Sequence, residues 1–289
     1  MSEWTLGIIG GSGLYQLDAL EDASWISMDT PWGSPSDELL TGHIGAVKCV
    51  FLPRHGRGHT VGPSQLNFRA NIDAMKRAGV TDLVSISAVG SLTEDMAPGN
   101  FVVVDQFIDR TFARVKSFFG DGLVAHVSMA DPVCPRLSAL AADAARSAGA
   151  KVHDGGTYLA MEGPQFSTRA ESHMYRSWGA DIIGMTAMPE AKLAREAELP
   201  YALIGMVTDY DCWRENEAAV EVGAIIAQLG ANASAARALV EHLAIALPEK
   251  REPSPIDNVL DFALITDPAM RDPLLTAKLD AVAGRVLGD

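Results

Sequence analysis

Short apolar runs alternate with glycine-rich or polar turns through the first part of the chain. Four of these runs have strand length (6–11, 47–54, 82–92 and 100–109), and a segment with helical spacing, 67–80, lies between the second and the third. Apolar runs of this length, bounded by turn residues, are typical of buried strands. Their alternation with a helical segment predicts an α/β sheet with helices on its faces.

The second part of the chain repeats this alternation. The strands are expected at 155–163, 181–186 and 201–210, and the helices at 136–149, 167–180, 190–199 and 215–247. Ser167 is the expected N-cap of its helix. After Pro248 the sequence becomes polar and rich in proline, and 272–287 is amphipathic. We predict a single domain over 1–247, followed by a proline-rich loop and a helical tail over 248–289.

Composition and charge exclude several classes of protein. The 289-residue chain has a formal net charge of −14, whereas a nucleic-acid-binding protein needs a basic face. No apolar run reaches the ~20 residues that cross a bilayer, and the N-terminus has no signal-peptide pattern. The three cysteines form no CxxC, and no His/Cys cluster has zinc-ligand spacing. We expect a cytoplasmic protein with no structural metal, no membrane partner and no nucleic-acid partner.

Two cationic residues follow the second predicted strand. Arg54 and His55 begin the sequence RHGRGH, and the carboxyl ends of strands are where open α/β sheets bind ligands. A guanidinium offers a planar fork of donors to phosphate oxygens, and His55 can add another donor. In so acidic a protein, an anionic substrate needs a local positive potential of this kind. The alternative interpretation is a solvated basic loop.

The first predicted strand ends in Gly10-Gly11-Ser12-Gly13. The backbone N–H groups of such a loop and the Ser12 hydroxyl could hold an anion. A dinucleotide-binding fingerprint is a second interpretation, but Gln16 stands where a third small residue belongs. A plain tight turn is the third.

Three further segments place small or polar residues after predicted strands. Ala88 lies among small residues that would let backbone amides approach a ligand, Glu162 stands beside a Gly-Pro turn, and Met185 and Thr186 end a strand. A carboxylate in that setting can bind a sugar hydroxyl, and thioether contacts adapt to many shapes. A packing turn, a surface glutamate at a helix entry and core methionines are the structural alternatives.

Two carboxylates, Asp209 and Asp211, follow the last predicted strand of the main domain. At positions i and i+2 of an extended chain they project to the same side. Paired carboxylates in a pocket raise each other's pKa, which would make one of them a proton donor near neutral pH. An aspartate-rich turn is the alternative, and a metal site lacks further acidic partners.

Taken together, these segments resemble the trimeric purine nucleoside phosphorylase superfamily, and within it the 5'-methylthioadenosine phosphorylases. The matching strings are IGGSGLY, DTPWGSPSD, RHGRGH, PSQLNFRANI, GSL, DQFIDRT, MEGPQFSTRAES, MTAMPEAKLAREAELPYA and TDYDCW. They extend from residue 7 to about 213, with helical similarity to about 245. The resemblance implies a nucleoside phosphorylase domain over 1–247, a mixed, partly barrel-like sheet flanked by helices, and a homotrimer with sites at subunit interfaces.

The resemblance also implies a set of site residues. The phosphate ligands of the family fall on Ser12, Arg54, His55, Ala88 (by its backbone) and Thr186. The sugar-contacting methionine falls on Met185, the base pocket on Phe166, Ser167, Asp209 and Asp211, and the apolar pocket for a 5'-alkylthio group on Val222, Ile225 and Ile226. His126 matches a residue donated by a neighbouring subunit. The i, i+3, i+4 spacing of the three apolar residues puts them on one helix face, which is also typical of plain core.

The implied reaction converts methylthioadenosine and inorganic phosphate to adenine and 5-methylthioribose 1-phosphate, with phosphate as co-substrate and no cofactor. Asp209 is the expected proton donor to purine N7. Relatives that prefer 6-oxopurines commonly carry Asn at the position of Asp209, so 6-aminopurines are expected here. The alternatives are a 6-oxopurine phosphorylase acting on inosine, guanosine or methylthioinosine, a hydrolase that uses water, and a dinucleotide-binding module.

Overall fold

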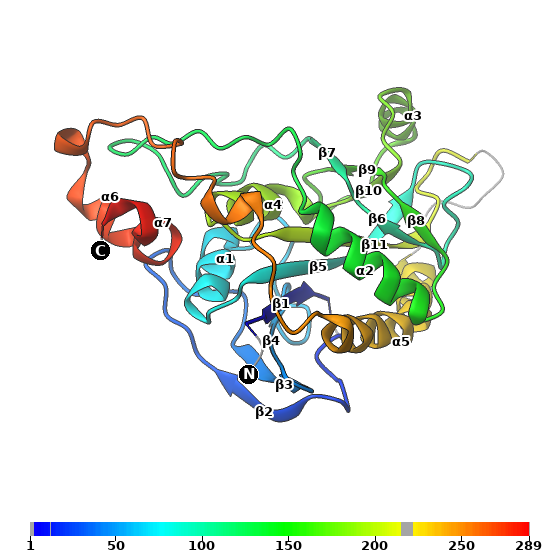
Figure 1. Ribbon diagram of the computed structural model, residues 1–289. Helices are drawn as coiled ribbons and strands as arrows, with labels where there is room; N and C mark the ends of the chain where they lie inside the picture. The colour runs from blue at the N-terminus through cyan, green and yellow to red at the C-terminus, as the bar shows by residue number, and fades with distance from the viewer. Residues whose placement is uncertain (1–2, 12, 215–221, 289) are drawn as a thin grey trace.

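The computed structural model describes residues 3–11, 13–214 and 222–288, with only the backbone described at 222 and 224 (Figure 1). A large sheet forms the centre, and its strands are β1 Thr5–Gly10, β2 Glu21–Ile26, β3 Leu39–Ile44, β4 Val47–Pro53, β5 Asp82–Ser91, β6 Phe101–Val103, β7 Gln106–Asp109, β8 Val152–Asp154, β9 Thr157–Ala160, β10 Ile182–Gly184 and β11 Tyr201–Asp209. The helices are α1 Phe68–Arg77, α2 Pro135–Ser147, α3 Arg169–Ser177, α4 Ala187–Glu196, α5 Val222–Ala246, α6 Pro273–Lys278 and α7 Asp280–Leu287. Two short 3₁₀ turns, Pro255–Asn258 and Pro268–Met270, lie in the tail.

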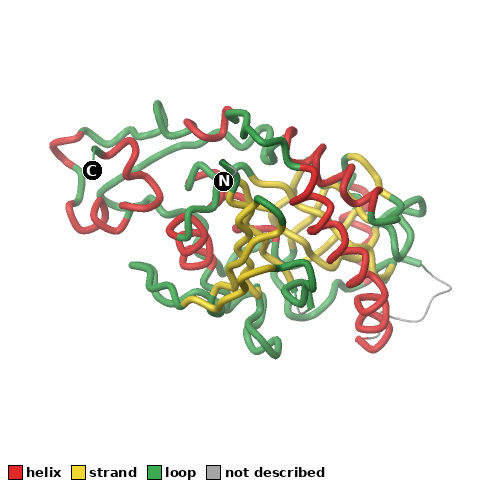
Figure 2. Tube along the Cα trace, turned by 60° about the horizontal axis from the view of Figure 1, so that its bottom comes forward, coloured by secondary structure: helices red, strands yellow, loops and turns green. Residues whose placement is uncertain are grey.

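The sheet is mixed and branches at β5, as the sequence predicted for a mixed α/β fold. β5 pairs in parallel with β1 and β11 and antiparallel with β10, while β1 also pairs in parallel with β4. Figure 2 shows the strands gathered between the helices. Because β4, β1, β5 and β11 run in the same direction, their carboxyl ends meet at one edge of the sheet. The segments 10–13, 54–59 and 209–213 follow these ends, whereas 161–167 and 185–190 follow β9 and β10, which run antiparallel to β5.

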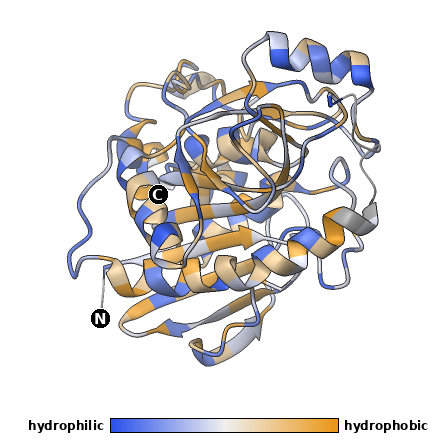
Figure 3. Ribbon diagram, turned by 90° about the vertical axis from the view of Figure 1, so that its right-hand side faces the viewer, coloured by the Kyte–Doolittle hydropathy of each residue, from blue (hydrophilic) through white to orange (hydrophobic). Residues whose placement is uncertain are grey.

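Alternating residues of the central strands face two separate apolar cores. Along β5, Leu83 packs in the core beneath α1 and α4, whereas Val84 and Ile86 pack in the core beneath α2 and α5. Figure 3 shows the apolar strands enclosed by helices. A strand buried on both faces needs apolar residues at successive positions, which explains the continuous apolar runs in the sequence.

Several predicted elements differ from the structure. The single strand expected over 100–109 is two strands, because β6 pairs with β11 and β8 while β7 pairs with β9. β2 and β3 were not predicted, and β2 is largely exposed at the sheet edge. The helix expected over 272–287 is divided into α6 and α7 at Leu279.

The predicted N-cap of α3 was also wrong by one residue. Thr168, and not Ser167, caps the helix: its hydroxyl accepts a hydrogen bond from the Glu171 amide, and the Glu171 carboxylate accepts one from the Thr168 amide. This reciprocal capping box satisfies two free N–H groups at the helix start. Ser167 is thereby left to face its own neighbours in the site.

The tail packs back on the main domain. Leu260, Leu279 and Val282 share the core beneath α1 and α4, and Arg285 forms an ion pair with Glu198 at 2.6 Å. The boundary between the domain and the tail at residue 247 stays a prediction. Among the helices in the described ranges, none combines the length and apolar character needed to span a membrane.

Candidate active site at the carboxyl ends of the strands

Arg54 leaves the end of β4 and turns into the protein interior. Its amide donates to Gly10 O at the end of β1, and its residue exposure is 1%. Nε donates to Glu190 Oε2 at 3.0 Å, Nη1 to Ile86 O at 3.1 Å, and Nη2 to Ser85 Oγ at 2.6 Å and Ile9 O at 3.1 Å. Four of its five N–H groups are therefore used within the protein, and one on Nη1 is left without a partner in the described part of the chain. Its role as a phosphate ligand stays a prediction.

His55 is placed beside Arg54 with one ring nitrogen already engaged. Its Nδ1 lies 2.8 Å from Val61 O, and its ring stacks on His59 with centroids 4.4 Å apart. A carbonyl can only accept, so Nδ1 carries the proton. Burial, together with the neighbouring Arg54 charge, lowers the pKa of His55 to about 4. The neutral ring therefore leaves Nε2 as an acceptor in this structure, and the role of His55 toward phosphate stays a prediction.

Thr186 meets the end of β5. Its hydroxyl lies 3.2 Å from Oγ of Ser87, the residue that precedes Ala88 in the chain. Its amide donates to the Tyr158 hydroxyl at 3.4 Å. Tyr158 and Ser87 are buried, whereas Ala88 is partly exposed. The structure thus brings together Ala88 and Thr186, two residues predicted to bind phosphate.

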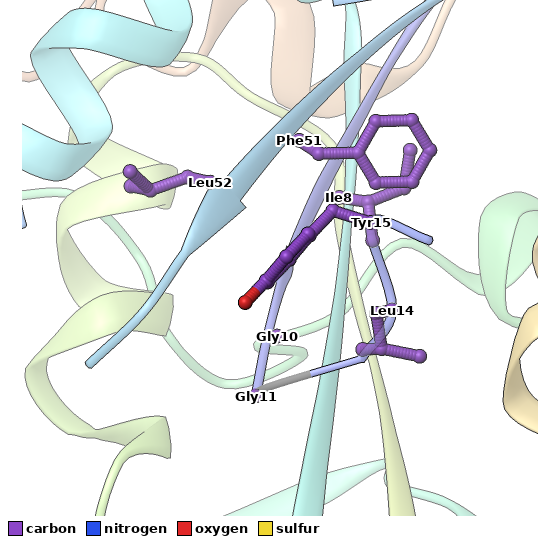
Figure 4. A pocket seen from close by; sticks show the side chains of 7 residues that line it. All are labelled: Ile8, Gly10, Gly11, Leu14, Tyr15, Phe51 and Leu52. Carbon is purple, nitrogen blue, oxygen red and sulfur yellow. The ribbon is translucent and has the colours of Figure 1, made fainter. Parts of the chain in front are cut away.

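The glycine segment after β1 borders the same region. Figure 4 shows a small pocket at the ends of β1 and β4, lined by Ile8, Gly10, Gly11, Leu14, Tyr15, Phe51 and Leu52. A Cβ on Gly10 would overlap Leu14 Cδ1, so a larger residue there would require the Leu14 side chain to shift. Ser12 lies outside the described residues, and its role stays a prediction.

The two aspartates lie at the carboxyl end of β11, beside the carboxyl end of β5. Asp209 Oδ2 accepts from Thr208 Oγ1 at 2.7 Å, and its Oδ1 accepts from the Asp211 amide at 2.8 Å. Asp211 has φ 51° and stands in a turn, so the extended geometry expected for the pair was wrong. A Cβ on Gly90 would lie 2.9 Å from Asp209 Oδ1, which shows how closely β5 approaches the pair.

Burial is the main cause of the raised pKa of both carboxyl groups. The pKa of Asp209 is raised by burial, against hydrogen bonds from Thr208 and the Asp211 amide. The pKa of Asp211 is raised by burial as well, and repulsion from Asp209 adds to it. The predicted repulsion between the two carboxylates therefore contributes to the raised pKa of Asp211 alone, whereas burial accounts for the raised pKa of Asp209.

Residues of the segment 161–167 join the aspartates. The Cys212 thiol donates to Ser167 O at 3.2 Å, and Ser167 also hydrogen bonds to the Asp211 carboxyl. Phe166 is 45% exposed beside Ser167. A Cβ on Gly163 would lie 2.5 Å from Met185 Sδ, so the loop holding the predicted base pocket touches the predicted sugar-binding methionine.

Glu162 does not present a free carboxylate to a sugar. Oε2 accepts from the Phe112 amide at 2.7 Å, and Oε1 accepts from the Ser64 hydroxyl and from Arg114 Nε at 3.4 Å. Burial raises the pKa of Glu162, but the hydrogen bond from Ser64 and those from backbone amides outweigh it and bring the pKa to about 2. The expectation that Glu162 binds a sugar hydroxyl was wrong, because both its oxygens are used within the protein.

The remaining predicted residues are on the loop after β7 and on α5. His126 is exposed on the loop between β7 and α2, where its amide donates to Ala263 O in the tail. In α5, Ile225 is partly buried and Ile226 is 62% exposed, which contradicts a plain core role for Ile226. The side chain of Val222 lies outside the described residues. In the described ranges, no three His, Cys, Asp or Glu residues are grouped as a metal site.

β5 connects the two halves of the arrangement. Arg54 contacts Ile86 O, Thr186 contacts Ser87, and Asp209 is in register with Gly90. At about 3.3 Å per residue, Ile86 and Gly90 are roughly 13 Å apart along the strand. Arg54 therefore contacts the middle of β5, and Asp209 lies near the carboxyl end of the same strand.

Comparison with known proteins decides the family. Residues 5–244 match the model of the phosphorylase superfamily. The chain belongs to the phosphorylase superfamily. It is 64% identical over 284 residues to the S-methyl-5'-thioadenosine phosphorylase of Cereibacter sphaeroides, covering 98% of each chain. It is 58% identical over 289 residues to the S-methyl-5'-thioadenosine phosphorylase of Bradyrhizobium diazoefficiens, covering 99% of each.

Solved structures of other superfamily members agree. A methylthioadenosine phosphorylase from an antarctic soil metagenomic library is similar with a TM-score of 0.92 and 46% identity, over 98% of this chain and 99% of that one. A methylthioadenosine phosphorylase from Schistosoma mansoni in complex with adenine has a TM-score of 0.80 and 39% identity, over 83% and 91%. The predicted family and fold are confirmed.

Three buried residues of this phosphorylase-superfamily site were missed in the sequence. Glu190 pairs with Arg54, Tyr158 supports Thr186, and Arg114 contacts the loops around Met185. Of the three, only Glu190 could have been anticipated from the sequence, because a buried arginine after an apolar strand requires a carboxylate as counter-ion. The other two depend on contacts distant in sequence.

Proposed function

We propose that this protein is a phosphorylase that converts methylthioadenosine and inorganic phosphate to adenine and 5-methylthioribose 1-phosphate. The bond from purine N9 to sugar C1' breaks, a phosphate oxygen bonds to C1', and a proton goes to the leaving purine. The observation that carries the proposal is that Arg54 and Thr186 contact the middle of β5, whereas the partly buried Asp209 lies beside Gly90 near the carboxyl end of the same strand. The names of the relatives and the adenine complex of a structural neighbour support the same substrate.

The phosphate end of the proposed site is built from Ser12, Arg54, His55, Ala88 and Thr186. Phosphate held beneath C1' stabilises the positive charge that develops on the sugar as the glycosidic bond breaks. Fixing both reactants also removes part of the entropic barrier. Met185 would support the sugar between phosphate and base, with Phe166, Ser167 and Asp211 around the purine and Val222, Ile225 and Ile226 around the 5'-alkylthio group.

Asp209 is the proposed general acid. The leaving purine acquires negative charge, which a protonated carboxyl group at N7 relieves and an ionised one would repel. Its raised pKa, caused mainly by burial, favours the protonated form. General acid catalysis of this kind contributes about 10²–10⁴-fold to the rate.

The assembly and location are part of the proposal. We infer a cytoplasmic homotrimer in which a neighbouring subunit supplies His126. The exposed position of His126, on a loop joined to the tail, supports a role outside its own subunit. Sedimentation at micromolar concentration should give three times the mass of the 30.7 kDa chain.

One assay tests the activity. The purified protein is incubated with methylthioadenosine, with and without inorganic phosphate, and adenine is measured by chromatography. We expect adenine release only with phosphate. Release without phosphate would identify a hydrolase, and equal phosphate-dependent release of hypoxanthine from inosine would identify a 6-oxopurine phosphorylase.

A further inference from the structure

Arg114 stands in the long segment after β7 and is almost completely buried. Only 1% of its side chain is exposed, although the segment around it forms neither helix nor strand. A buried arginine must satisfy five N–H groups and one positive charge. Its partners therefore show what the protein uses it for.

Its guanidinium lies over the Phe68 ring, and all its hydrogen-bond partners belong to two segments of the proposed site. Nη1 donates to Met185 O and to Met188 O, both at 2.6 Å. Nη2 donates to Glu162 O at 2.7 Å and more weakly to Met161 O at 3.4 Å. One guanidinium plane thus fixes the turn between β10 and α4 and the loop that leads to Phe166 and Ser167.

Glu162 closes this arrangement from the other side. Its carboxylate accepts from the amides of Phe112 and Ala113, next to Arg114 in the chain, and pairs with Arg114 Nε. Arg114 therefore fixes the backbone of the loop at Glu162, and the Glu162 carboxylate in turn fixes the segment that carries Arg114. Gly163 packs directly on Met185, so a shift of either loop would move the other.

We propose that Arg114 is a positioning residue that sets the separation between the sugar-binding turn at Met185 and the base-binding loop 161–167. This inference rests on the proposed function. Arg114 acts through backbone carbonyls and through its partner Glu162. Thr186 has independent supports in Ser87 and Tyr158, so the phosphate end should depend less on Arg114.

The test is Arg114→Lys, which keeps the charge but cannot span four carbonyl groups in a plane. A misplacement of about 1 Å can cost about 10²-fold in rate, so we expect kcat/KM for methylthioadenosine to fall about 10–100-fold, with KM raised about tenfold. KM for phosphate should change less than about twofold. A merely structural role would lower the active fraction, and hence apparent kcat, while leaving both KM values unchanged.

The matched control is Arg195→Lys. Arg195 is also buried, in the last turn of α4, and also donates to two carbonyls, Ser128 O and Asp131 O, but these belong to the loop before α2 and not to the turn at Met185 or the loop 161–167. It should leave KM for methylthioadenosine within about twofold of wild type. Equal KM effects from the two lysine variants would overturn the proposal, as would an unchanged KM in Arg114→Lys.

Adenine binding by calorimetry gives a readout that needs no turnover. Adenine should bind Arg114→Lys about fivefold or more weakly than wild type, and Arg195→Lys normally. If Arg114→Lys does not fold, Glu162→Gln replaces it, and we expect KM for methylthioadenosine to rise about threefold. A wild type that binds adenine but releases none from methylthioadenosine refutes the proposed function alone, and one that does neither refutes both.

Discussion

The buried ion pair between Arg54 and Glu190 allows a test of the structure that needs no substrate. Their side chains are 2% and 1% exposed, and Nε lies 3.0 Å from Oε2. In Arg54→Met, Glu190 would keep only the hydroxyl groups of Ser85, at 2.6 Å, and Tyr201, at 2.9 Å, as donors. Removing one partner of a buried pair leaves an uncompensated charge and costs about 3–5 kcal/mol.

This magnitude translates into a measurable thermal shift. For a chain of this size, 1 kcal/mol corresponds to about 2 °C in Tm, so Arg54→Met should unfold about 6–10 °C below wild type. The double variant Arg54→Met, Glu190→Gln removes both charges and should be more stable than Arg54→Met alone. Circular dichroism during heating, with urea unfolding for the free energies, measures all three proteins.

The control is the exposed pair of the same loop. Arg57 contacts Asp37 and Glu38 at 2.8 Å with 44% of its side chain exposed, so Arg57→Met should change Tm little. Two outcomes would contradict a coupled buried pair. One is that Arg54→Met lowers the free energy of unfolding by less than about 1 kcal/mol. The other is that the double variant loses as much free energy of unfolding as the two single variants together.

Three further predictions concern pH, salt and catalysis. Asp209→Asn should lower kcat on methylthioadenosine about 10²-fold. It should also remove the fall in rate that we expect for the wild type as rising pH ionises Asp209. Adenine release measured across a range of pH tests both. KM for phosphate should rise less than about twofold between 0.05 and 0.5 M NaCl, because Glu190 offsets the charge of Arg54; a steep rise would show a net cationic site. Burial raises the pKa of Glu196 from 4.5 to about 7, so the protonated carboxyl group stabilises the fold below pH 4.5. This contribution, about 3 kcal/mol at most, is lost as the pH rises through 7. Glu196→Gln should therefore make the free energy of unfolding in urea depend less on pH between about pH 5 and 8.

The sequence predicts most of the central sheet because β1, β4, β5 and β11 are apolar on both faces. Such runs stand out against the turns that bound them, and each contains a residue of the proposed site or is followed by one within two residues. β2 was missed for the opposite reason: it lies at the exposed edge, and its sequence EDASWI has no apolar run. Pairing with β3 alone makes it a strand, and a single segment does not contain that information.

The site was predicted in outline and corrected in its electrostatics. Position at a strand end follows from local sequence, so the places of Thr186 and Asp209 after β10 and at the end of β11 were predicted, and their roles in the site stay predictions. The direction of a long side chain does not follow from local sequence. Arg54 turns inward to Glu190, which is 136 residues away in the chain. The protonation of His55 likewise depends on Val61 O, a contact created by the fold of the loop.

These corrections change how an acidic protein would bind an anion. At a net charge of −14, the long-range field opposes phosphate, and Arg54 does not reverse it because Glu190 lies 3.0 Å from its Nε. A compensated pair acts as a dipole, whose potential falls faster with distance than that of a single charge. His55 is neutral at physiological pH because its pKa is about 4. Phosphate would therefore be recognised at contact range, through the remaining Nη1 hydrogen, hydroxyl groups and backbone amides, and this site would hold its anion without attracting it from solution.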